Sequence, residues 1–374
     1  MRIAITADVH LGFGKGTERF EEPFLALKEF IEKSKECDAI IIAGDLFDLR
    51  TPDHDITTQA MELFIPALLA KKDKRIFGIG KDVSKAPEYT LSGIPIILIH
   101  GTHERRSRGL VNPIQSLERA GFVLYLDRNG ILIDGGKEKV AVQGLSTVPE
   151  GWAQSVMQEW GPQPIPGCFN ILIFHQTLAG LFPGIPGIDI ADIPAGFDLY
   201  VCGHIHSRAD KVINGKRLLI PGSLVATQLD EDAESKRGFW ILETNPFMLK
   251  FHAIENQRPI FFAKSEEEIK EILSRGHKMK PLIKVDMPGR EKEIQARYGE
   301  GALLVFKKQQ KEGFAARSLE MQRASVQEIG SKILESSLRD AGLEPEIWEQ
   351  VFELLLEKRA DDVIKLLKQQ FKEG

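Results

Sequence analysis

The chain has 374 residues, 43% of them hydrophobic and 28% charged, and its formal net charge is -5. At about 100–200 residues per domain this length predicts two or three domains of an ordinary globular protein. No apolar run approaches the ~18 residues of a membrane span, and the N-terminus lacks a signal-peptide layout, so we expect no membrane partner and no export. The acidic net charge excludes global attraction to nucleic acid, so any DNA binding would depend on local basic patches and bound metal.

The cysteine content fits a reducing compartment. Cys37, Cys168 and Cys202 show no CxxC spacing, which argues against a disulfide framework and against a cysteine zinc site. We therefore expect a cytoplasmic protein in which each cysteine is a small buried hydrophobe.

The first part of the chain alternates apolar strands with amphipathic helices. Asp38–Ala43 is almost continuously apolar, as expected of a strand buried on both faces. Helical spacing of apolar residues predicts helices at Phe24–Ser34, Thr58–Leu69 and Pro113–Ala120. The other predicted strands are Ile3–Ala7, Ile94–Ile99, Phe122–Leu126, Lys139–Gln143, Asn170–Phe174, Leu199–Cys202 and Arg217–Ile220. This alternation predicts an α/β layered domain with a large sheet core. The sequence leaves open whether Lys72–Ser92 is a surface loop or contains further elements of that domain.

The pattern changes near Asn256. A compact β-α-β-α-β unit follows, with predicted elements at Pro259–Ala263, Glu266–Ser274, Pro281–Asp286, Arg290–Tyr298 and Ala302–Lys307. From Ser318 the sequence is helical in character, and Pro345 suits the first turn of a helix. We divide the chain into a main domain at 1–255, a small α/β capping domain at 256–312 that would contact DNA, and a helical C-terminal region at 313–374.

Five apolar strands run into short loops that carry metal-ligand residue types. The loops are DVH at 8–10, GDLFD at 44–48, GTHE at 101–104, HQT at 175–177 and GHIH at 203–206. In an open α/β sheet ligands bind at the carboxyl ends of the strands, so these side chains are expected to share one edge. Each motif alone is weak, since a lone GD is more often a turn. Five in this order, each after an apolar strand, predict a site.

The residue types favour divalent transition metals. Carboxylates with imidazoles suit Mn, Fe or Zn better than Ca or Mg. Asp8 and His10, two apart in an extended segment, would point to the same side, and His204 and His206 would do likewise. A carboxylate such as Asp45 can bridge two cations, and two metals ~3.5–4 Å apart can clamp a phosphate and activate water. The glycines before the ligands would let the backbone turn and leave room for substrate.

This ordered set resembles the calcineurin-like metallophosphoesterase superfamily. The stretches DVHLG at 8–12 and AGDLFD at 43–48 are similar to its DNA double-strand-break repair nuclease branch, the SbcD-like nuclease subunit of a nuclease–ATPase complex. The resemblance covers about Met1–Thr244. It implies a four-layer β-sandwich flanked by helices, with two divalent ions per chain, most often Mn²⁺. It implies His103 as the catalytic residue that protonates the leaving oxygen, and metal ligands at Asp8, His10, Asp45, Thr102, His175, His204 and His206.

The third motif departs from the family. The family has an Asn between the Gly and His, where this chain has Thr102. A hydroxyl is shorter than a carboxamide and would reach a metal only through a water. One metal would then be held more weakly, unless His100 or Glu104 compensates.

Several residues near the motifs carry two interpretations. Asp48 is either a turn carboxylate or a group that orients a histidine ligand. Arg105, Arg106 and Arg108 either hold DNA phosphates or form a solvated basic loop. Further DNA-binding candidates are Lys15 and Arg19.

The chain lacks a GxxxxGK[ST] motif, so ATP dependence would come from another chain. The resemblance implies an SMC-like coiled-coil ATPase partner and a homodimer. The C-terminal helices would form a hairpin that docks on the ATPase or packs on its own domain.

Three functions remain open at this stage. The first is a Mn-dependent DNA nuclease, exonuclease or endonuclease, that processes ends in double-strand-break repair. The second is a small-nucleotide phosphodiesterase. The third is a catalytically weak scaffold on DNA ends that recruits an ATPase, which Thr102 keeps open.

Overall fold

The computed structural model describes residues 1–107, 109–179, 187–229 and 233–307, together with 350, 351, 354, 362–364 and 366. The C-terminal region predicted at 313–374 therefore lies outside the described residues, apart from those isolated positions. Among the described residues, no helix is both long and apolar enough to cross a bilayer.

The first sheet has six strands in the order β13-β12-β1-β2-β4-β5. Its central strands run parallel, with β1 beside β2, β2 beside β4 and β4 beside β5, and β12 pairs antiparallel with β1. The strands are β1 Arg2–Thr6, β2 Ala39–Ala43, β4 Ile96–Ile99, β5 Leu124–Tyr125, β12 Gly238–Thr244 and β13 Phe247–Ala253.

The second sheet has seven strands in the order β10-β11-β9-β8-β7-β6-β3. Its core is the parallel run β7, β8, β9 and β11. The strands are β3 Arg75–Ile79, β6 Asn129–Asp134, β7 Lys139–Leu145, β8 Phe169–His175, β9 Leu199–Gly203, β10 Ala209–Ile213 and β11 Lys216–Ile220.

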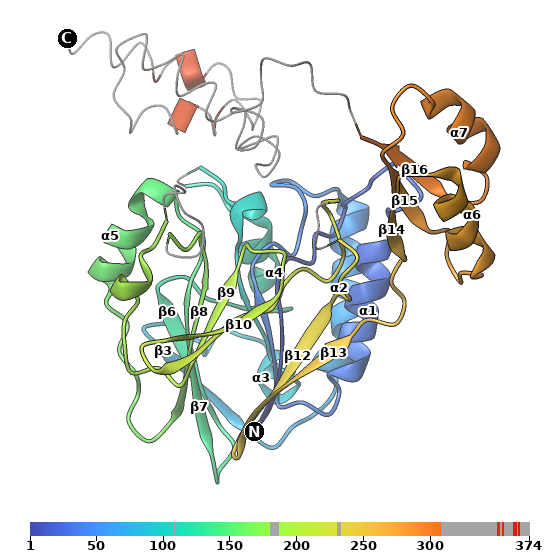
Figure 1. Ribbon diagram of the computed structural model, residues 1–374. Helices are drawn as coiled ribbons and strands as arrows, with labels where there is room; N and C mark the ends of the chain where they lie inside the picture. The colour runs from blue at the N-terminus through green and yellow to red at the C-terminus, as the bar shows by residue number, and fades with distance from the viewer. Residues whose placement is uncertain are drawn as a thin grey trace.

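The two sheets pack face to face between helical layers (Figure 1). Alternation along β1 explains the layers, because Ile3 and Ile5 face the other sheet while Ala4 faces the helices. Helices α1 Glu22–Lys33, α2 His54–Leu68 and α4 Pro113–Arg119 cover the first sheet, and α5 Glu150–Trp160 covers the second. The predicted four-layer α/β fold is confirmed.

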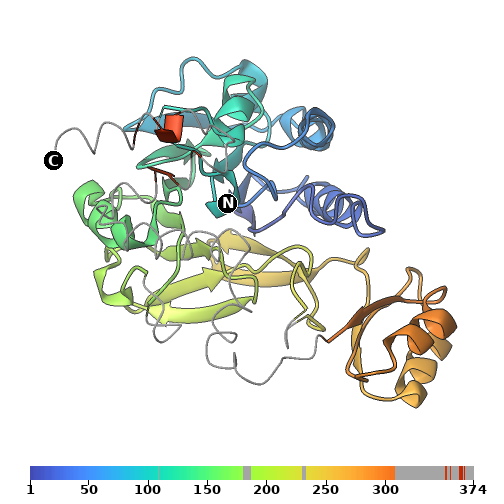
Figure 2. The same cartoon turned by 90° about the horizontal axis from the view of Figure 1, so that it is seen from above.

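A separate three-stranded parallel sheet follows the main sandwich. Its elements are β14 Ile260–Ala263, α6 Glu266–Ser274, β15 Leu282–Val285, α7 Glu291–Tyr298 and β16 Leu303–Phe306. They enclose a hydrophobic cluster of their own and lie to one side of the two sheets (Figure 2). We call residues 259–307 the three-stranded unit.

The stretch Lys72–Ser92 is more than a surface loop. It contains β3 at the edge of the second sheet, paired antiparallel with β6, and the short helix α3 Glu88–Ser92. Only Ile76 is buried along β3. An edge strand with one buried side chain lacks the apolar run that marks a central strand, which is why the sequence did not reveal it.

Candidate metal centre

The five ligand-bearing loops meet at one end of the sandwich. Three follow β1, β2 and β4 of the first sheet, and two follow β8 and β9 of the second. Contacts between the loops show the convergence: the amide of His204 donates to both carboxylate oxygens of Asp8, at 3.1 and 3.2 Å. The predicted shared edge is thus made by both sheets together.

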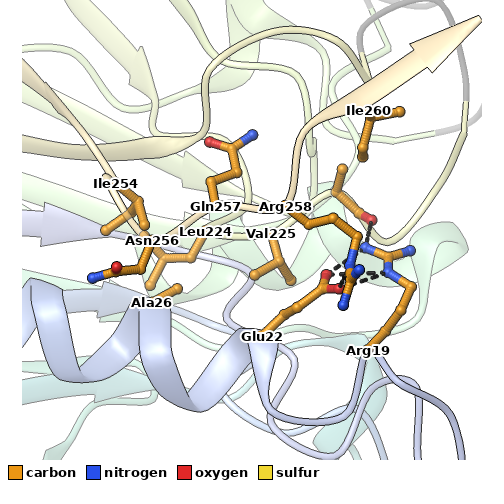
Figure 3. Close-up of a pocket in the computed structure, with 11 residues that line it drawn as sticks. Arg19, Glu22, Ala26, Leu224, Val225, Ile254, Asn256, Gln257, Arg258 and Ile260 are labelled. Atoms are coloured by element: carbon orange, nitrogen blue, oxygen red, sulfur yellow. Dashed lines mark hydrogen bonds and ion pairs between the residues drawn. The ribbon is translucent and has the colours of Figure 1, made fainter. Parts of the chain in front are cut away.

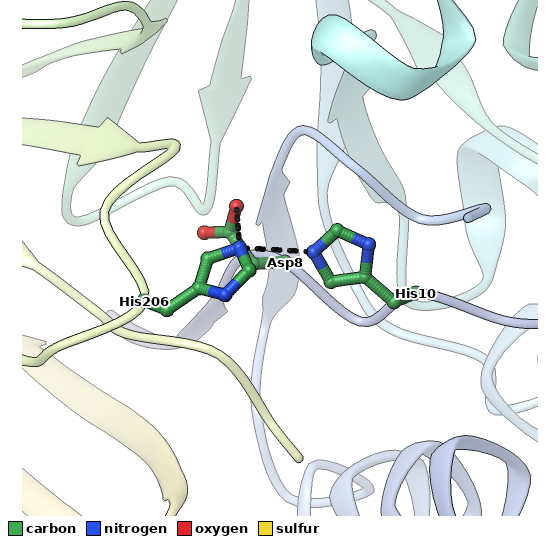
Figure 4. A group of neighbouring side chains, drawn as sticks. All are labelled: Asp8, His10 and His206. Carbon is green, nitrogen blue, oxygen red and sulfur yellow. Dashed lines mark hydrogen bonds and ion pairs between the residues drawn. The ribbon is translucent and has the colours of Figure 1, made fainter. Parts of the chain in front are cut away.

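Asp8, His10 and His206 form one group of potential metal donors (Figure 4). The Nε2 atoms of His10 and His206 lie 3.1 Å apart, and Nε2 of His206 lies 3.7 Å from Oδ1 of Asp8. Two imidazole nitrogens and a carboxylate oxygen this close together suit a shared divalent cation.

Asp48 fixes the ring of His10 from behind. Its Oδ1 lies 3.1 Å from Nδ1 of His10, which turns Nε2 toward His206. Of the two interpretations of Asp48, this geometry matches the one in which it orients a histidine ligand.

Asp45 and His175 form the core of a second donor group, which shares Asp8 with the first. The Nδ1 hydrogen of His175 is directed at the carbonyl of Ala43, at 2.8 Å. Its buried Nε2 lies 3.2 Å from Oδ2 of Asp45 and makes no hydrogen bond among the described residues. A buried imidazole nitrogen without a hydrogen bond, beside two carboxylates, is a position that a divalent cation would satisfy, so the residues fit a metal.

Thr102 contacts His204, and neither residue belongs to the donor groups found among the described residues. The Oγ1 atom of Thr102 is 3.5 Å from Nδ1 of His204, a long contact for a hydrogen bond. His100 and Glu104, the two residues that could replace the missing Asn ligand, both contact other groups. Nδ1 of His100 contacts the Tyr125 hydroxyl at 2.8 Å, and both carboxylate oxygens of Glu104 accept backbone N–H groups, from Phe47 and Gly101.

His103 forms a third group of potential metal donors with His10 and Asp48, and its side chain is partly exposed. Its amide donates to Oδ1 of Asp45 at 2.9 Å, and its Nδ1 lies 2.9 Å from the carbonyl of Asp48. The side chain is 22% exposed, so Nε2 can meet a substrate. Burial opposes protonation, but the Asp45 carboxylate and the Asp48 carbonyl outweigh it and raise the pKa of His103.

Burial and neighbouring charges separate the pKa values of the donors. Burial raises the pKa of Asp8 to about 6. Burial opposes ionisation of Asp45 too, but the imidazoles of His175 and His103 hold its pKa well below the ordinary value. Burial lowers the pKa of His175, yet the Asp45 carboxylate outweighs it and raises that pKa to about 9. Burial lowers the pKa of His204 to about 4, which keeps this imidazole neutral.

The ligand loops are not extended, contrary to our expectation. Asp8, His10, Asp45 and His204 all have positive φ, at 52°, 56°, 49° and 80°. Residues with side chains rarely adopt this left-handed conformation, and it persists at functional sites where the surroundings enforce it. Asp8 and His10 thus share a side through two left-handed turns and not through strand alternation.

The glycines before the ligands make room for the ligands themselves. A Cβ on Gly44 would lie 2.2 Å from Nδ1 of His175, and one on Gly101 would lie 2.1 Å from Oδ1 of Asp45. A Cβ on Gly203 would lie 2.0 Å from the carbonyl of Ala43. Our expectation that these glycines leave room for substrate is wrong, because protein atoms fill that space.

The basic candidates for DNA contact differ in their surroundings. Exposed Lys15 pairs with Asp53. Arg19 donates to Glu22 and to the Ala226 carbonyl and is only 11% exposed, so it has few donors left for a phosphate. Arg105 and Arg106 lie half-buried directly after the His103 loop. Arg108 lies outside the described residues.

The sequence did not predict the roles of two residues, Glu104 and Thr227. Glu104 ties the second and third loops together through Phe47 and Gly101, and its place in the GTHE motif is a signal that we weighed only as a ligand. Oγ1 of Thr227 lies 2.9 Å from Nδ1 of His206, and no motif surrounds Thr227 in the sequence.

Comparison with known proteins agrees with this geometry. Residues 1–208 match the calcineurin-like phosphoesterase family. The DNA double-strand break repair protein Mre11 of Methanopyrus kandleri is 29% identical over 316 residues, covering 76% of this chain and 65% of that protein. The Mre11 protein of Sulfolobus acidocaldarius is 27% identical over 214 residues, covering 55% and 49%. The human double-strand break repair protein MRE11 is 25% identical over 290 residues, covering 68% and 40%.

The chain thus spans between 40% and 65% of the length of these relatives. The family match itself extends over more than half of the chain and contains all six Asp and His donors and His103. The chain therefore belongs to the calcineurin-like phosphoesterase family.

Proposed function

We propose that this chain is a Mn²⁺-dependent DNA nuclease that hydrolyses phosphodiester bonds at DNA ends during double-strand-break repair. The observation that carries the proposal is the pairing of two adjoining donor groups with a partly exposed histidine, His103. The names of the relatives, which are DNA double-strand break repair proteins, support DNA as the substrate.

In this proposal two divalent ions share the centre. Asp8, His10 and His206 would hold one, while His175, His204 and Thr102 would hold the other, with Asp45 between them. Such ions supply neutralisation of a phosphate and activation of water. Asp48 orients His10, and Ala43 orients His175, so that each Nε2 faces the centre.

His103 would provide the proton for the leaving oxygen. Its Nδ1 is held by the carbonyl of Asp48, which leaves Nε2 for the substrate. The Asp45 carboxylate and the Asp48 carbonyl raise its pKa, in the direction that a proton donor needs. Arg105, Arg106 and Arg108 follow directly in the sequence and would hold neighbouring phosphates.

The remaining parts have assigned roles in the same proposal. Residues 1–255 would be the nuclease domain, 256–312 a cap that orients DNA, and 313–374 a hairpin for an SMC-like ATPase, in a homodimeric assembly. The acidic net charge of -5 means that basic loops, and not the whole surface, attract DNA.

The test is nuclease activity on end-labelled linear and hairpin DNA with Mn²⁺. The native chain should cut, and His103→Ala should reduce the rate by roughly 10²–10⁴-fold, the usual contribution of a general acid. His54→Ala is the matched control, because His54 is exposed at the start of α2. It should cut like the native chain.

A second candidate, the catalytically weak scaffold, rests on the long Thr102–His204 contact. If the native chain is inert and Thr102→Asn cuts DNA, the scaffold is correct. If both are inert on DNA but hydrolyse a small nucleotide phosphodiester, the substrate is a small molecule.

A further inference from the structure

The ring of His206 is held by Thr227, a residue of the loop after β11. Oγ1 of Thr227 lies 2.9 Å from Nδ1 of His206. Two other donor histidines are held through the same nitrogen, His10 by Asp48 and His175 by Ala43. A histidine that binds a cation through Nε2 carries its hydrogen on Nδ1, so the acceptor at Nδ1 selects the tautomer and the ring orientation.

The loop that carries Thr227 is bound closely to the metal centre. The amide of Ser223 donates to the carbonyl of His206 at 3.0 Å, and the amide of Leu224 donates to the carbonyl of Asp8 at 3.4 Å. The loop therefore touches the backbone of two candidate ligands as well as the ring of His206.

The same loop is the surface on which the three-stranded unit rests. Ala226 shares a hydrophobic cluster with Ile260 of β14 and Leu282 of β15, and Leu229 packs against it. The carbonyl of Leu229 also accepts a hydrogen bond of 2.5 Å from Nζ of Lys284 in β15. Thr227 thus lies between two residues that contact the unit.

Two arginines secure this junction (Figure 3). Glu22 of α1, itself buried, pairs with Arg19 and with Arg258, the residue that leads into the unit. Arg19 also donates to the carbonyl of Ala226 at 2.7 Å, and Arg258 to the carbonyl of Glu18 at 2.9 Å. Figure 3 shows both guanidinium groups meeting Glu22 near Val225.

We propose that Thr227 is a positioning residue for His206. We also propose that the packing of the three-stranded unit against the 223–229 loop holds Thr227 in place. The affinity of the Asp8–His10–His206 group for a metal ion then depends on the packing of the three-stranded unit against this loop. The inference rests on the proposed function, because it assumes that this group binds a divalent ion.

The first test is calorimetric titration of the full metal-free chain with Mn²⁺, with the Mn²⁺ electron paramagnetic resonance spectrum as a second readout. Thr227→Val keeps the shape but loses the hydroxyl, and should weaken one site about 10- to 100-fold, as for other groups that hold a metal-binding histidine. Thr227→Ser should restore the affinity. Thr57→Val, which removes an exposed hydroxyl in α2, should change nothing.

The second test separates the effect of the contact between the unit and the loop from the effect of the Thr227 hydroxyl. Lys284→Met removes the contact to the loop, whereas Lys280→Met, in the same unit, removes an exposed contact to Glu18 of the main domain. Lys284→Met should weaken the same site several-fold, Lys280→Met should not, and Lys284→Met should add nothing to Thr227→Val. Additive losses, or no loss in Lys284→Met, would overturn the coupling.

The outcomes separate this inference from the function itself. A native chain that binds no Mn²⁺ would overturn both. A native chain that binds two ions, with Thr227→Val unchanged in affinity and spectrum, would overturn this inference alone. If Thr227→Val does not fold, Thr227→Ala provides the same comparison, and the Thr227→Ser and Lys284→Met measurements still decide the outcome.

Discussion

Nε2 of His175 lies 3.2 Å from a carboxylate oxygen of Asp45, although the two residues end strands of different sheets. The contact lies at one end of the sandwich and joins a donor that follows a strand of the first sheet to a donor at the end of a strand of the second. It exists because Gly44 and Gly203 lack side chains where the imidazole sits. The metal centre is therefore a property of the sheet-to-sheet packing and not of either sheet alone.

Metal binding should release a proton from His175. In the metal-free protein the Asp45 carboxylate outweighs burial and raises the pKa of His175 to about 9, so the ring is protonated at pH 7. A ligand must be deprotonated, so affinity for Mn²⁺ should rise from pH 7 to about 9 and then level off. Calorimetry in buffers of different ionisation enthalpy measures the protons released. Affinity that does not change over this range would contradict the pairing of His175 with Asp45.

Gly44→Ala should lower the free energy of unfolding by more than its left-handed backbone conformation alone explains. Gly44 has φ +93°, and an added Cβ would meet Nδ1 of His175 at 2.2 Å. Gly16 is the matched control, with φ +79° and no atom within 4 Å of an added Cβ. Gly16→Ala should cost about 1–2 kcal/mol from the left-handed conformation. Gly44→Ala should cost about 1–3 kcal/mol more from overpacking and should also weaken Mn²⁺ binding. Urea unfolding and metal titration measure both, and equal losses for the two variants would refute the packing argument.

The buried pair of Arg258 with Glu22 should hold the three-stranded unit to α1. Arg258→Met leaves the buried Glu22 carboxylate with Arg19 as its one cationic partner, and the lost contact should cost about 1–3 kcal/mol in the free energy of unfolding. Arg275→Met removes an exposed pair with Glu271 and should cost about 0.5 kcal/mol or less. Urea unfolding of both variants checks this. A loss in Arg258→Met as small as that in Arg275→Met would show that the pair contributes little.

Thr102→Asn should tighten one metal site. Oγ1 of Thr102 lies 3.5 Å from Nδ1 of His204, and a carboxamide oxygen extends further into the centre. We expect a gain of roughly tenfold in Mn²⁺ affinity, ~1.4 kcal/mol. Thr102→Val, which has no oxygen, should bind no better than the native chain. If Thr102→Asn binds more weakly than the native chain, the threonine is already the better ligand in this setting.

The sequence predicted the parallel strands of the two large sheets because they carry strong apolar patterns. β2 was found at Ala39–Ala43 because burial on both faces requires an apolar run, and the elements of the three-stranded unit were found from their alternation. β3 was not found, because only Ile76 is buried there. β6, β10, β12 and β13, which pair antiparallel, were not predicted either, although β6 and β12 lie inside their sheets. Alternating burial marks such strands less clearly than a continuous apolar run.

The candidate site was predictable only in part. The Asp and His donors have motifs, and the structure brings five of the six into the donor groups. His204 lies next to them, with its amide on Asp8 and its ring centroid 5.3 Å from that of His175. Their left-handed backbone, the packing role of Gly44 and the contact of Thr227 with His206 depend on tertiary neighbours far away in the chain. Arg19 follows the first motif as a DNA-contacting residue would, but its guanidinium is taken by Glu22 and Ala226, which no sequence pattern showed.

The most direct test of the account is the number of metal ions bound per chain, measured by equilibrium dialysis against Mn²⁺ with elemental analysis. The Asp8–His10–His206 and Asp8–Asp45–His175 groups predict two ions for the native chain. Asp45→Ala removes the carboxylate between them and should leave fewer than one tightly bound ion, while circular dichroism shows a folded protein. One ion or none on the native chain, or two ions still bound to Asp45→Ala, would contradict a two-metal centre at these residues.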